Sequence, residues 1–162
     1  MAFELFVNGT LMRGLALHDN LAGATFVAEA RTAPIYRLYS IADRHPGLKL
    51  IIDHYGRPDA AWSSLPKVLA LAKRPNIALK ATGGPSYSRE AYPFRDIEGH
   101  IRKLYDAFGP ERMFWGTDIT RMPCSWRQCV THFTEALPWL SAKDKDLIMG
   151  RALCNWLGWN LA

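Results

Sequence analysis

The sequence lacks the features that mark secreted and membrane-spanning proteins. Its 162 residues contain only three cysteines, at positions 124, 129 and 154, and no CxxC pair, which fits free thiols in a reducing compartment better than a disulfide framework. No stretch approaches the roughly 18 consecutive apolar residues of a membrane span. The first ten residues, MAFELFVNGT, are too polar and too short in their apolar run for a signal peptide. We therefore expect a cytoplasmic protein with no membrane partner.

Runs of basic residues are also absent. The formal net charge is +5 and the pI is about 9.3, but the Lys and Arg residues are scattered, so no nucleic-acid partner is expected. Hydrophobic residues make up 49% of the chain and charged residues 22%, a balance typical of soluble globular proteins. The length is sufficient for one domain with a sizeable core.

The last three-quarters of the sequence alternates short apolar runs with helical patterns. Strands are predicted at residues 48–53, 77–81 and 113–115, where apolar runs end at Gly, Pro or charged residues. Helices are predicted at residues 65–71, 97–105, 126–140 and 142–157, the last opened by a capping-box pattern at 141–144. This alternation favours a parallel sheet with right-handed crossovers.

Polar residues follow all three predicted strands: His54 after the first, Lys80 and Thr82 at the second, and Asp118 after the third. The C-terminal ends of parallel strands, here called strand exits, lie together along one side of the sheet, where α/β proteins build their sites. We therefore expect these groups to converge. Asp118 suits a metal ligand or a general base. Two alternatives stay open: a turn or helix-capping role for Asp118, and a hydrogen-bonded loop position for His54.

Several other residues of types that can bind metal or substrate are expected to have structural roles. Cys124 and Cys129 are predicted to pack as small apolar side chains rather than to bind metal. His132 is expected at a helix surface or cap, and Trp156 and Trp159 of the last helix are expected in the core.

The N-terminal quarter predicts a short β-α-β-β segment. Strands are expected at residues 3–7, 24–30 and 35–40, with a helix from Thr10 to Asn20. The text LFVNGTLMRG, followed by GATFVAEARTAPIYRLYSI, resembles the start of a γ-glutamylcyclotransferase-like domain of the type attached to allophanate hydrolases. The resemblance covers residues 3–41 and implies that Gly9, Thr10 and Leu11 line a substrate pocket.

The remaining chain resembles a different family. The motifs HPGLKLIIDHYGRP, PNIALKATGGPSYSREAYPFRDI and FGPERMFWGTDITRMP are similar to those of the amidohydrolase-related TIM-barrel hydrolases, which include metal-dependent hydrolases, decarboxylases and lactonases. The match runs over residues 45–159 and corresponds to the sixth to eighth strand–helix units of that barrel.

This second resemblance implies roles for four residues. His54 would bind a divalent metal (zinc or manganese) or polarise a carbonyl group, and Asp118 would bind the metal and take a proton from the attacking water. Arg57 and Lys80 would bind an anionic substrate. The His-x-His pair of the family's first strand is absent from this sequence.

The fold class expected is therefore α/β, a partial (β/α) TIM-barrel-like parallel sheet preceded by the β-α-β-β segment. Two domains are predicted, residues 1–41 and 42–162, as a chimera with its junction between positions 40 and 46. The function expected is hydrolysis of an amide, ester or lactone of a small, anionic carbonyl substrate. Two alternatives are a non-catalytic module that forms a homo-oligomer through exposed strand edges, and a γ-glutamylcyclotransferase-like remnant that binds γ-glutamyl compounds.

Overall fold

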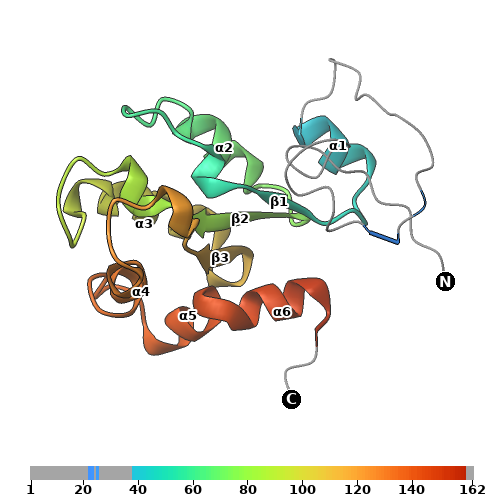
Figure 1. Cartoon of the computed structure of the whole chain (residues 1–162). Helices are drawn as coiled ribbons and strands as arrows, with labels where there is room; N and C mark the ends of the chain where they lie inside the picture. Colours follow the sequence, from blue (N-terminus) through green and yellow to red (C-terminus); the bar gives the residue numbers. More distant parts are fainter. Residues whose placement is uncertain (1–21, 24, 26–37, 160–162) are drawn as a thin grey trace. The chain divides into compact units, whose positions relative to one another are not determined.

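A three-stranded parallel sheet organises the part of the chain that the structure describes. The structure is a computed structural model and describes residues 22–23, 25 and 38–159. The chain divides into two units at Tyr36 and Arg37, and all described helices and strands belong to the second unit. The strands are β1 (Leu50–Ile52), β2 (Ile77–Thr82) and β3 (Met113–Gly116), in the order β1-β2-β3 (Figure 1).

Helices connect the strands in the manner predicted for parallel pairing. Helix α2 (Leu65–Leu71) lies between β1 and β2, and α3 (Glu98–Phe108) lies between β2 and β3. The register pairs Leu50 with Ile77 and Leu79 with Met113. The predicted fold class is confirmed, and the three strands lie where the apolar runs placed them.

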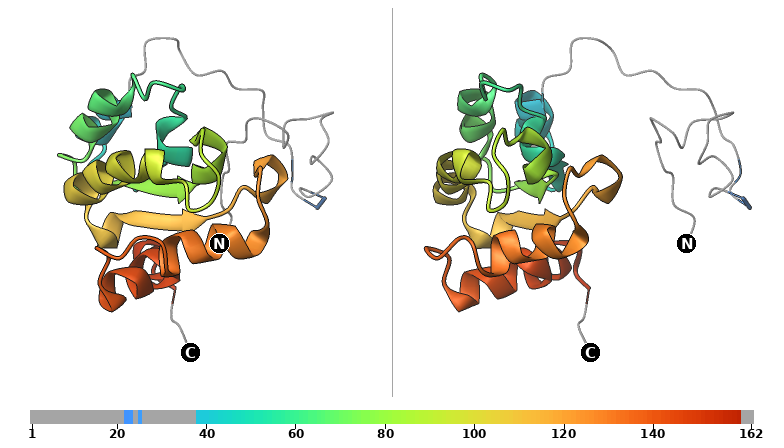
Figure 2. Two further views of the ribbon diagram at one scale, coloured as in Figure 1. Left: turned by 90° about the vertical axis from the view of Figure 1, so that its left-hand side faces the viewer. Right: turned by 60° about the vertical axis from the view of Figure 1, so that its left-hand side comes forward.

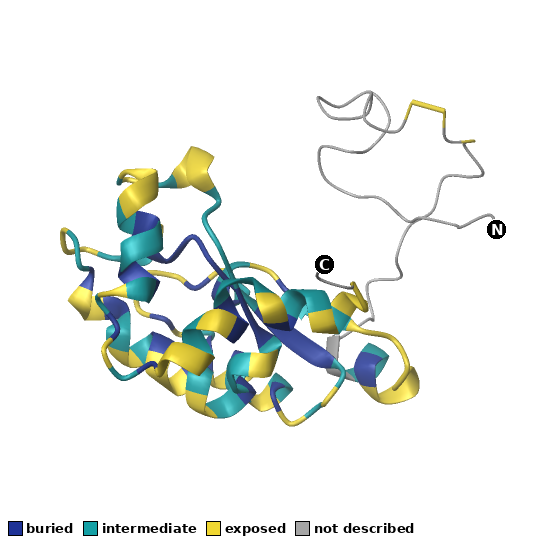
Figure 3. Cartoon of the chain, turned by 90° about the horizontal axis from the view of Figure 1, so that it is seen from below, coloured by how far each residue is buried: buried dark blue, intermediate teal, exposed yellow. Residues whose placement is uncertain are grey.

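Both faces of the sheet are covered by helices (Figure 2). Ile77 and Leu79 of β2 join the larger core, which also holds buried residues of α2 and α3. Ala78 and Phe114 face the other way, into a smaller core with residues of the last helices. The central strand is consequently dark blue in Figure 3, since only Lys80 among its six residues is not fully buried.

The C-terminal third consists of α4 (Trp126–Thr134), α5 (Ala142–Asp146), a π-helical turn (Leu147–Arg151) and α6 (Ala152–Leu157). The capping box predicted at Ser141 is present, with Asp144 as its reciprocal partner. The predicted helix 126–140 is wrong beyond Thr134. In a continuing helix Pro138 could donate no hydrogen bond to the Thr134 carbonyl group, and its ring would clash with that group. No helix within residues 38–159 is both long and apolar enough to cross a membrane.

Helix α1 (Leu38–Arg44) corrects a second prediction, since residues 38–40 were expected to end a strand. The helix buries Ala42 in the core and directs Asp43 toward Arg74, which pairs with it at 2.7 and 2.8 Å. These two tertiary contacts outweigh the local strand pattern. The strands predicted at 3–7 and 24–30 and the helix from Thr10 to Asn20 lie outside the described residues, apart from Thr25.

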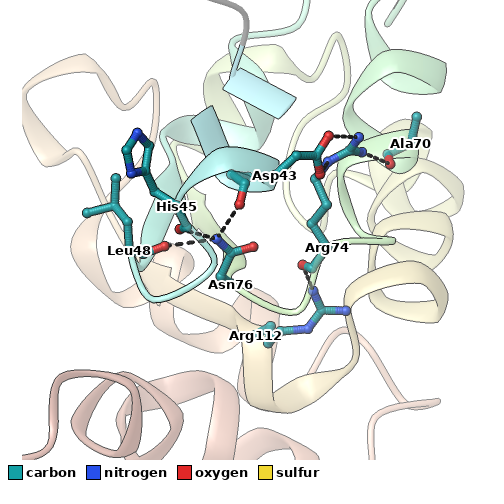
Figure 4. A network of polar contacts seen from close by, with 8 residues as sticks. Asp43, His45, Leu48, Ala70, Arg74, Asn76 and Arg112 are labelled. Atoms are coloured by element: carbon teal, nitrogen blue, oxygen red, sulfur yellow. Dashed lines mark hydrogen bonds and ion pairs between the residues drawn. The ribbon is translucent and has the colours of Figure 1, made fainter. Parts of the chain in front are cut away.

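A polar network fixes the ends of the sheet opposite the polar strand exits (Figure 4). The side-chain nitrogen of Asn76 lies 3.0–3.2 Å from the carbonyl oxygens of Ala42, His45 and Leu48. The Arg112 guanidinium donates to three further carbonyl oxygens, of Ala72, Arg74 and Ile77, at 2.9–3.0 Å. Six carbonyl groups outside regular hydrogen-bonding ladders or at helix and strand ends thus find side-chain donors.

Candidate functional site

The exits of the three strands bring His54, Thr82 and Asp118 together. His54 follows β1, and its Nδ1 lies 2.5 Å from the Thr82 hydroxyl oxygen at the end of β2. Its other ring nitrogen, Nε2, lies 3.8 Å from Oδ2 of Asp118, which follows β3. The His54 and Asp118 side chains are 16% and 24% exposed. The imidazole is thus oriented from one side and faces a partly accessible carboxylate on the other.

Asp118 does not serve as a helix cap. It precedes the 3-10 turn Ile119–Arg121, yet its side chain makes no capping hydrogen bond. The capping alternative therefore lacks the contact that defines it. His54, by contrast, does make the hydrogen bond expected of a loop histidine, in addition to facing Asp118.

The backbone at these strand exits adopts left-handed conformations that residues with side chains seldom take. The φ angles of His54, Tyr55 and Arg57 are 48°, 56° and 52°, and that of Asp118 is 57°. Each such residue costs about 1 kcal/mol or more relative to glycine. Strain of this kind concentrates at functional sites, where the surrounding structure holds it in place.

Strands β2 and β3 pack closely next to the site. A Cβ atom at Gly116 of β3 would lie 2.7 Å from the Thr82 methyl group, so only glycine allows this approach. The Gly83 N–H donates to the Thr117 carbonyl oxygen at 3.2 Å, which ties the end of β2 to the end of β3. The Thr82 hydroxyl is thereby held where His54 needs it.

Lys80 is paired with a neighbouring carboxylate. Its Nζ donates to Asp53 Oδ1 at 2.8 Å, and both side chains are about half exposed. Partial burial alone would raise the pKa of Asp53, but the hydrogen bond from Lys80 and the nearby charges of Lys80, His54 and Arg57 bring it below its usual value. Lys80 therefore already has a carboxylate partner within the chain.

Arg57, Tyr87 and Arg121 lie on the loops that follow β1, β2 and β3, respectively. Arg57 lies three residues after His54, and Arg121 lies three residues after Asp118. Burial raises the pKa of Tyr87, while the charges of Arg121 and Arg57 lower it and that of Asp118 raises it. The phenol, on the loop after β2, thus responds to charges carried by the loops after β1 and β3. Arg121 was not predicted from sequence, although its spacing from Asp118 repeats that of Arg57 from His54.

Metal ligands are few in this region. Among residues 22–23, 25 and 38–159, no group of three or more His, Cys, Asp or Glu side chains could hold one ion. Two ligands about 2.0–2.2 Å from a shared ion lie at most about 4.2 Å apart, so the 3.8 Å between His54 and Asp118 is compatible with one shared cation. A catalytic zinc usually has three protein ligands, so this pair supplies only part of a shell.

Other residues considered from sequence lie elsewhere or differ from expectation. Cys124 and Cys129 are free thiols with their sulfur atoms 3.6 Å apart, and burial with the neighbouring Cys124 raises the pKa of Cys129 to about 11. His132 is fully buried rather than at a surface, and Trp159 is 61% exposed rather than in the core. Trp156 packs against the smaller core as predicted.

Two hollows lie beside the sheet. The larger, about 280 Å³, is lined by residues 108–112 and by Lys143, Asp144 and Leu147, which places it where β3 begins rather than at the strand exits. The smaller, about 200 Å³, is lined by Tyr87, Trp62 and His100 among others, and it adjoins the site through Tyr87. Gly9, Thr10 and Leu11 lie outside the described residues.

A parallel α/β sheet with its polar groups gathered at the C-terminal ends of the strands is the arrangement of TIM-barrel proteins, and this chain holds a part of such a barrel. Comparison with known proteins agrees with this class. The chain belongs to the amidohydrolase family, whose profile matches residues 17–152.

Two curated relatives carry lactone names. An L-fucono-1,5-lactonase from Burkholderia ambifaria is 32% identical over 113 residues, which cover 64% of this chain and 36% of the relative. A 4-sulfomuconolactone hydrolase from Hydrogenophaga intermedia is 29% identical over 100 residues, covering 53% of this chain and 33% of the relative. The chain thus spans about a third of the length of the curated relatives it matches.

Two crystal structures share the fold. An amidohydrolase from Burkholderia multivorans with bound zinc has a TM-score of 0.63 at 24% identity, covering 75% of this chain and 48% of that one. A 2-pyrone-4,6-dicarboxylic acid hydrolase, assigned provisionally, from Pseudomonas putida has a TM-score of 0.59 at 26% identity, covering 76% and 48%.

The predicted chimera finds no support in these comparisons. The family match begins at residue 17, inside the segment that resembles a γ-glutamylcyclotransferase, and continues across the predicted junction at 40–46. The amidohydrolase part of the prediction is confirmed at the level of the family. The division into domains 1–41 and 42–162 stays a prediction.

Proposed function

We propose that this chain carries the hydrolytic site of an enzyme that opens lactones or related esters. The observation that supports the proposal most strongly is the approach of His54 Nε2 to Asp118 Oδ2, at 3.8 Å, across two separate strand–helix units. A partly exposed carboxylate next to an oriented imidazole suits water activation. The lactone names of the two curated relatives give the same class of substrate.

In the proposed reaction Asp118 accepts a proton from a water molecule whose oxygen bonds to the lactone carbonyl carbon. His54, with its proton on Nε2 and its Nδ1 accepting from Thr82, donates a hydrogen bond to the carbonyl oxygen. The ring C–O bond then breaks, and the proton passes from Asp118 to the leaving alkoxide oxygen. The product is the open hydroxy acid.

A divalent cation, zinc or manganese, is the cofactor we propose for this site. His54 would bind it through Nε2 in the tautomer that donates from Nδ1 to Thr82, and Asp118 would bind it through Oδ2. Such an ion supplies Lewis-acid polarisation of a carbonyl oxygen. Since two ligands make an incomplete shell, no step of the reaction above depends on the ion.

An anionic group on the substrate is expected to bind Arg57. This guanidinium is exposed, lies three residues after His54 in the chain and forms no ion pair with a carboxylate within residues 38–159. Lys80 is the weaker choice, because it would first have to release Asp53.

The test is hydrolysis of a panel of five- and six-membered lactones, followed by acid release at constant pH. We expect turnover of at least one lactone, and a loss of about 100-fold or more in Asp118→Asn. Asp106→Asn is the matched control, since within residues 38–159 the Asp106 side chain forms an exposed i,i+4 pair with Arg102 on α3 and no other ion pair. The assay is run with EDTA and with added zinc or manganese. Absence of turnover under all three conditions, or equal rates in Asp118→Asn, would overturn the proposal.

A second candidate is a non-catalytic module that assembles with further copies of itself. It is favoured by the sheet, in which β1 and β3 each have one strand neighbour among the described residues. Light scattering tests it: a monomer at micromolar concentration that hydrolyses lactones would contradict the module, and an inactive oligomer would support it.

A further inference from the structure

We infer that Arg121 and Tyr87 complete, with Arg57, a subsite for an oxyanion of the substrate, so that the chain acts on lactones or esters carrying a carboxylate or similar group. The inference rests on the proposed function and adds to it a second arginine and a phenol. Three observations support it: the placement of these groups, the charge of the two arginines with no ion-pair partner among the described residues, and the protonated hydroxyl group of Tyr87.

The loops that carry Arg121 and Tyr87 meet over the end of β2. A Cβ atom at Gly83 would lie 3.8 Å from Cε of Met122 and 3.8 Å from Cε2 of Tyr87. Met122 is the neighbour of Arg121 in the chain, and Gly83 is the neighbour of Thr82, which holds His54. The two loops therefore converge within one residue of the His54 contact.

Neither arginine is used by the described part of the fold. Arg74 pairs with Asp43, Arg102 with Asp106 and Arg151 with Asp146. Arg57 and Arg121 make no such pair or side-chain hydrogen bond within residues 38–159, and both are exposed. Two guanidinium groups with no ion-pair partner in the described part of the chain, on the loops that carry His54 and Asp118, outnumber the carboxylate of Asp118.

The hydroxyl group of Tyr87 is suited to donate a hydrogen bond to an anion. Its ring is half-buried against the edge of Trp62, with centroids 6.1 Å apart. Burial raises its pKa in spite of the lowering influence of Arg121 and Arg57. The phenol therefore keeps its proton at neutral pH and can donate to an anion that both guanidinium groups attract.

The arrangement also sets the direction of the substrate. Asp118 repels a substrate carboxylate, while Arg57 and Arg121 attract it, each through a planar fork that matches two carboxylate oxygens. A substrate held this way presents its carbonyl group, rather than its anionic group, to Asp118 and His54. Charge would thus contribute to positioning as well as to affinity.

The test compares two stable ring compounds that differ in charge: tetrahydropyran-2-carboxylate and tetrahydropyran-2-methanol. Binding to the full chain is measured by calorimetry for wild type, Arg121→Gln and Arg44→Gln. Arg44 is the matched control, because it is an exposed arginine at the end of α1, before β1 begins, at the other edge of the sheet. Tyr87→Phe tests the hydroxyl group separately.

We expect wild type to bind the carboxylate in preference to the alcohol, and Arg121→Gln to weaken carboxylate binding about tenfold or more. Tyr87→Phe should weaken it less, and Arg44→Gln should leave it unchanged. With a carboxylate-bearing lactone, Arg121→Gln should raise KM while kcat changes little, which a loss of folding would not produce.

Three results would overturn the inference: no preference of wild type for the carboxylate, equal binding in Arg121→Gln, or equal losses in Arg121→Gln and Arg44→Gln. The proposed function can fail separately from the subsite. If the chain binds the carboxylate through Arg121 but hydrolyses no lactone, the subsite stands and the proposed function fails. If wild type and Arg121→Gln both hydrolyse charged and neutral lactones equally, the proposed function stands and the subsite fails.

Discussion

At the scale of single residues, the geometry of the site depends on His54. Thr82 holds one ring nitrogen and Asp118 faces the other. The convergence of His54 and Asp118 could be expected from sequence, because both follow buried strands of a parallel sheet. The specific hydrogen bond between His54 and Thr82 could not, since it depends on the register between β1 and β2. The same holds for the pair between Lys80 and Asp53.

Replacing Thr82 with Val should lower kcat/KM for lactone hydrolysis about 10- to 100-fold. Valine keeps the shape of the side chain, but it removes the hydroxyl group that orients the imidazole. Thr82→Ser retains the hydroxyl and should stay within a few-fold of wild type. Steady-state kinetics of both variants, with melting temperatures alongside, checks this expectation. Equal activity of Thr82→Val and wild type would show that His54 needs no orienting partner.

At the scale of elements, the sequence predicted secondary structure best where the local pattern alone determines it. The strands at 77–82 and 113–116 are short apolar runs between breakers, so their identity followed from local composition. Residues 38–44 form a helix because Ala42 and Asp43 find partners far along the chain. No local pattern carries that information.

The pairing of β2 with β3 predicts a stability difference between two glycine variants. Gly116→Ala should lower the free energy of unfolding by about 1–3 kcal/mol, because its Cβ would overlap the Thr82 methyl group at 2.7 Å. Gly99→Ala in α3 meets no atom within 4 Å and should be neutral or stabilising by up to about 1 kcal/mol. Urea denaturation measures both, and similar values for the two variants would contradict the close strand packing.

At the scale of the whole molecule, the described chain is a three-stranded part of a barrel fold with a core on each face of the sheet. The chain spans about half the length of the structures it resembles. The family and the strand exits were predictable from motifs. The burial of His132 was not, since the sequence of its helix does not show which polar side chains face the core. Tertiary packing decides this.

The buried His132 should make stability depend on pH. Burial lowers its pKa from 6.5 to about 4. Between these values the unfolded chain binds a proton that the folded chain does not, so folding weakens as pH falls from about 6.5 to about 4. The loss from this group amounts to about 3 kcal/mol. Urea denaturation at pH 7 and pH 4.5 should show a smaller acid loss in His132→Leu than in wild type, and identical losses would contradict this assignment.

The measurement that tests the central claim most directly is a double-mutant cycle on kcat/KM with His54→Gln and Asp118→Asn. If His54 and Asp118 act as one unit on the same water and carbonyl group, the double variant should be no more than about threefold slower than the slower single variant. Penalties that instead multiply would show that the two residues act independently, and would contradict a single site at the strand exits.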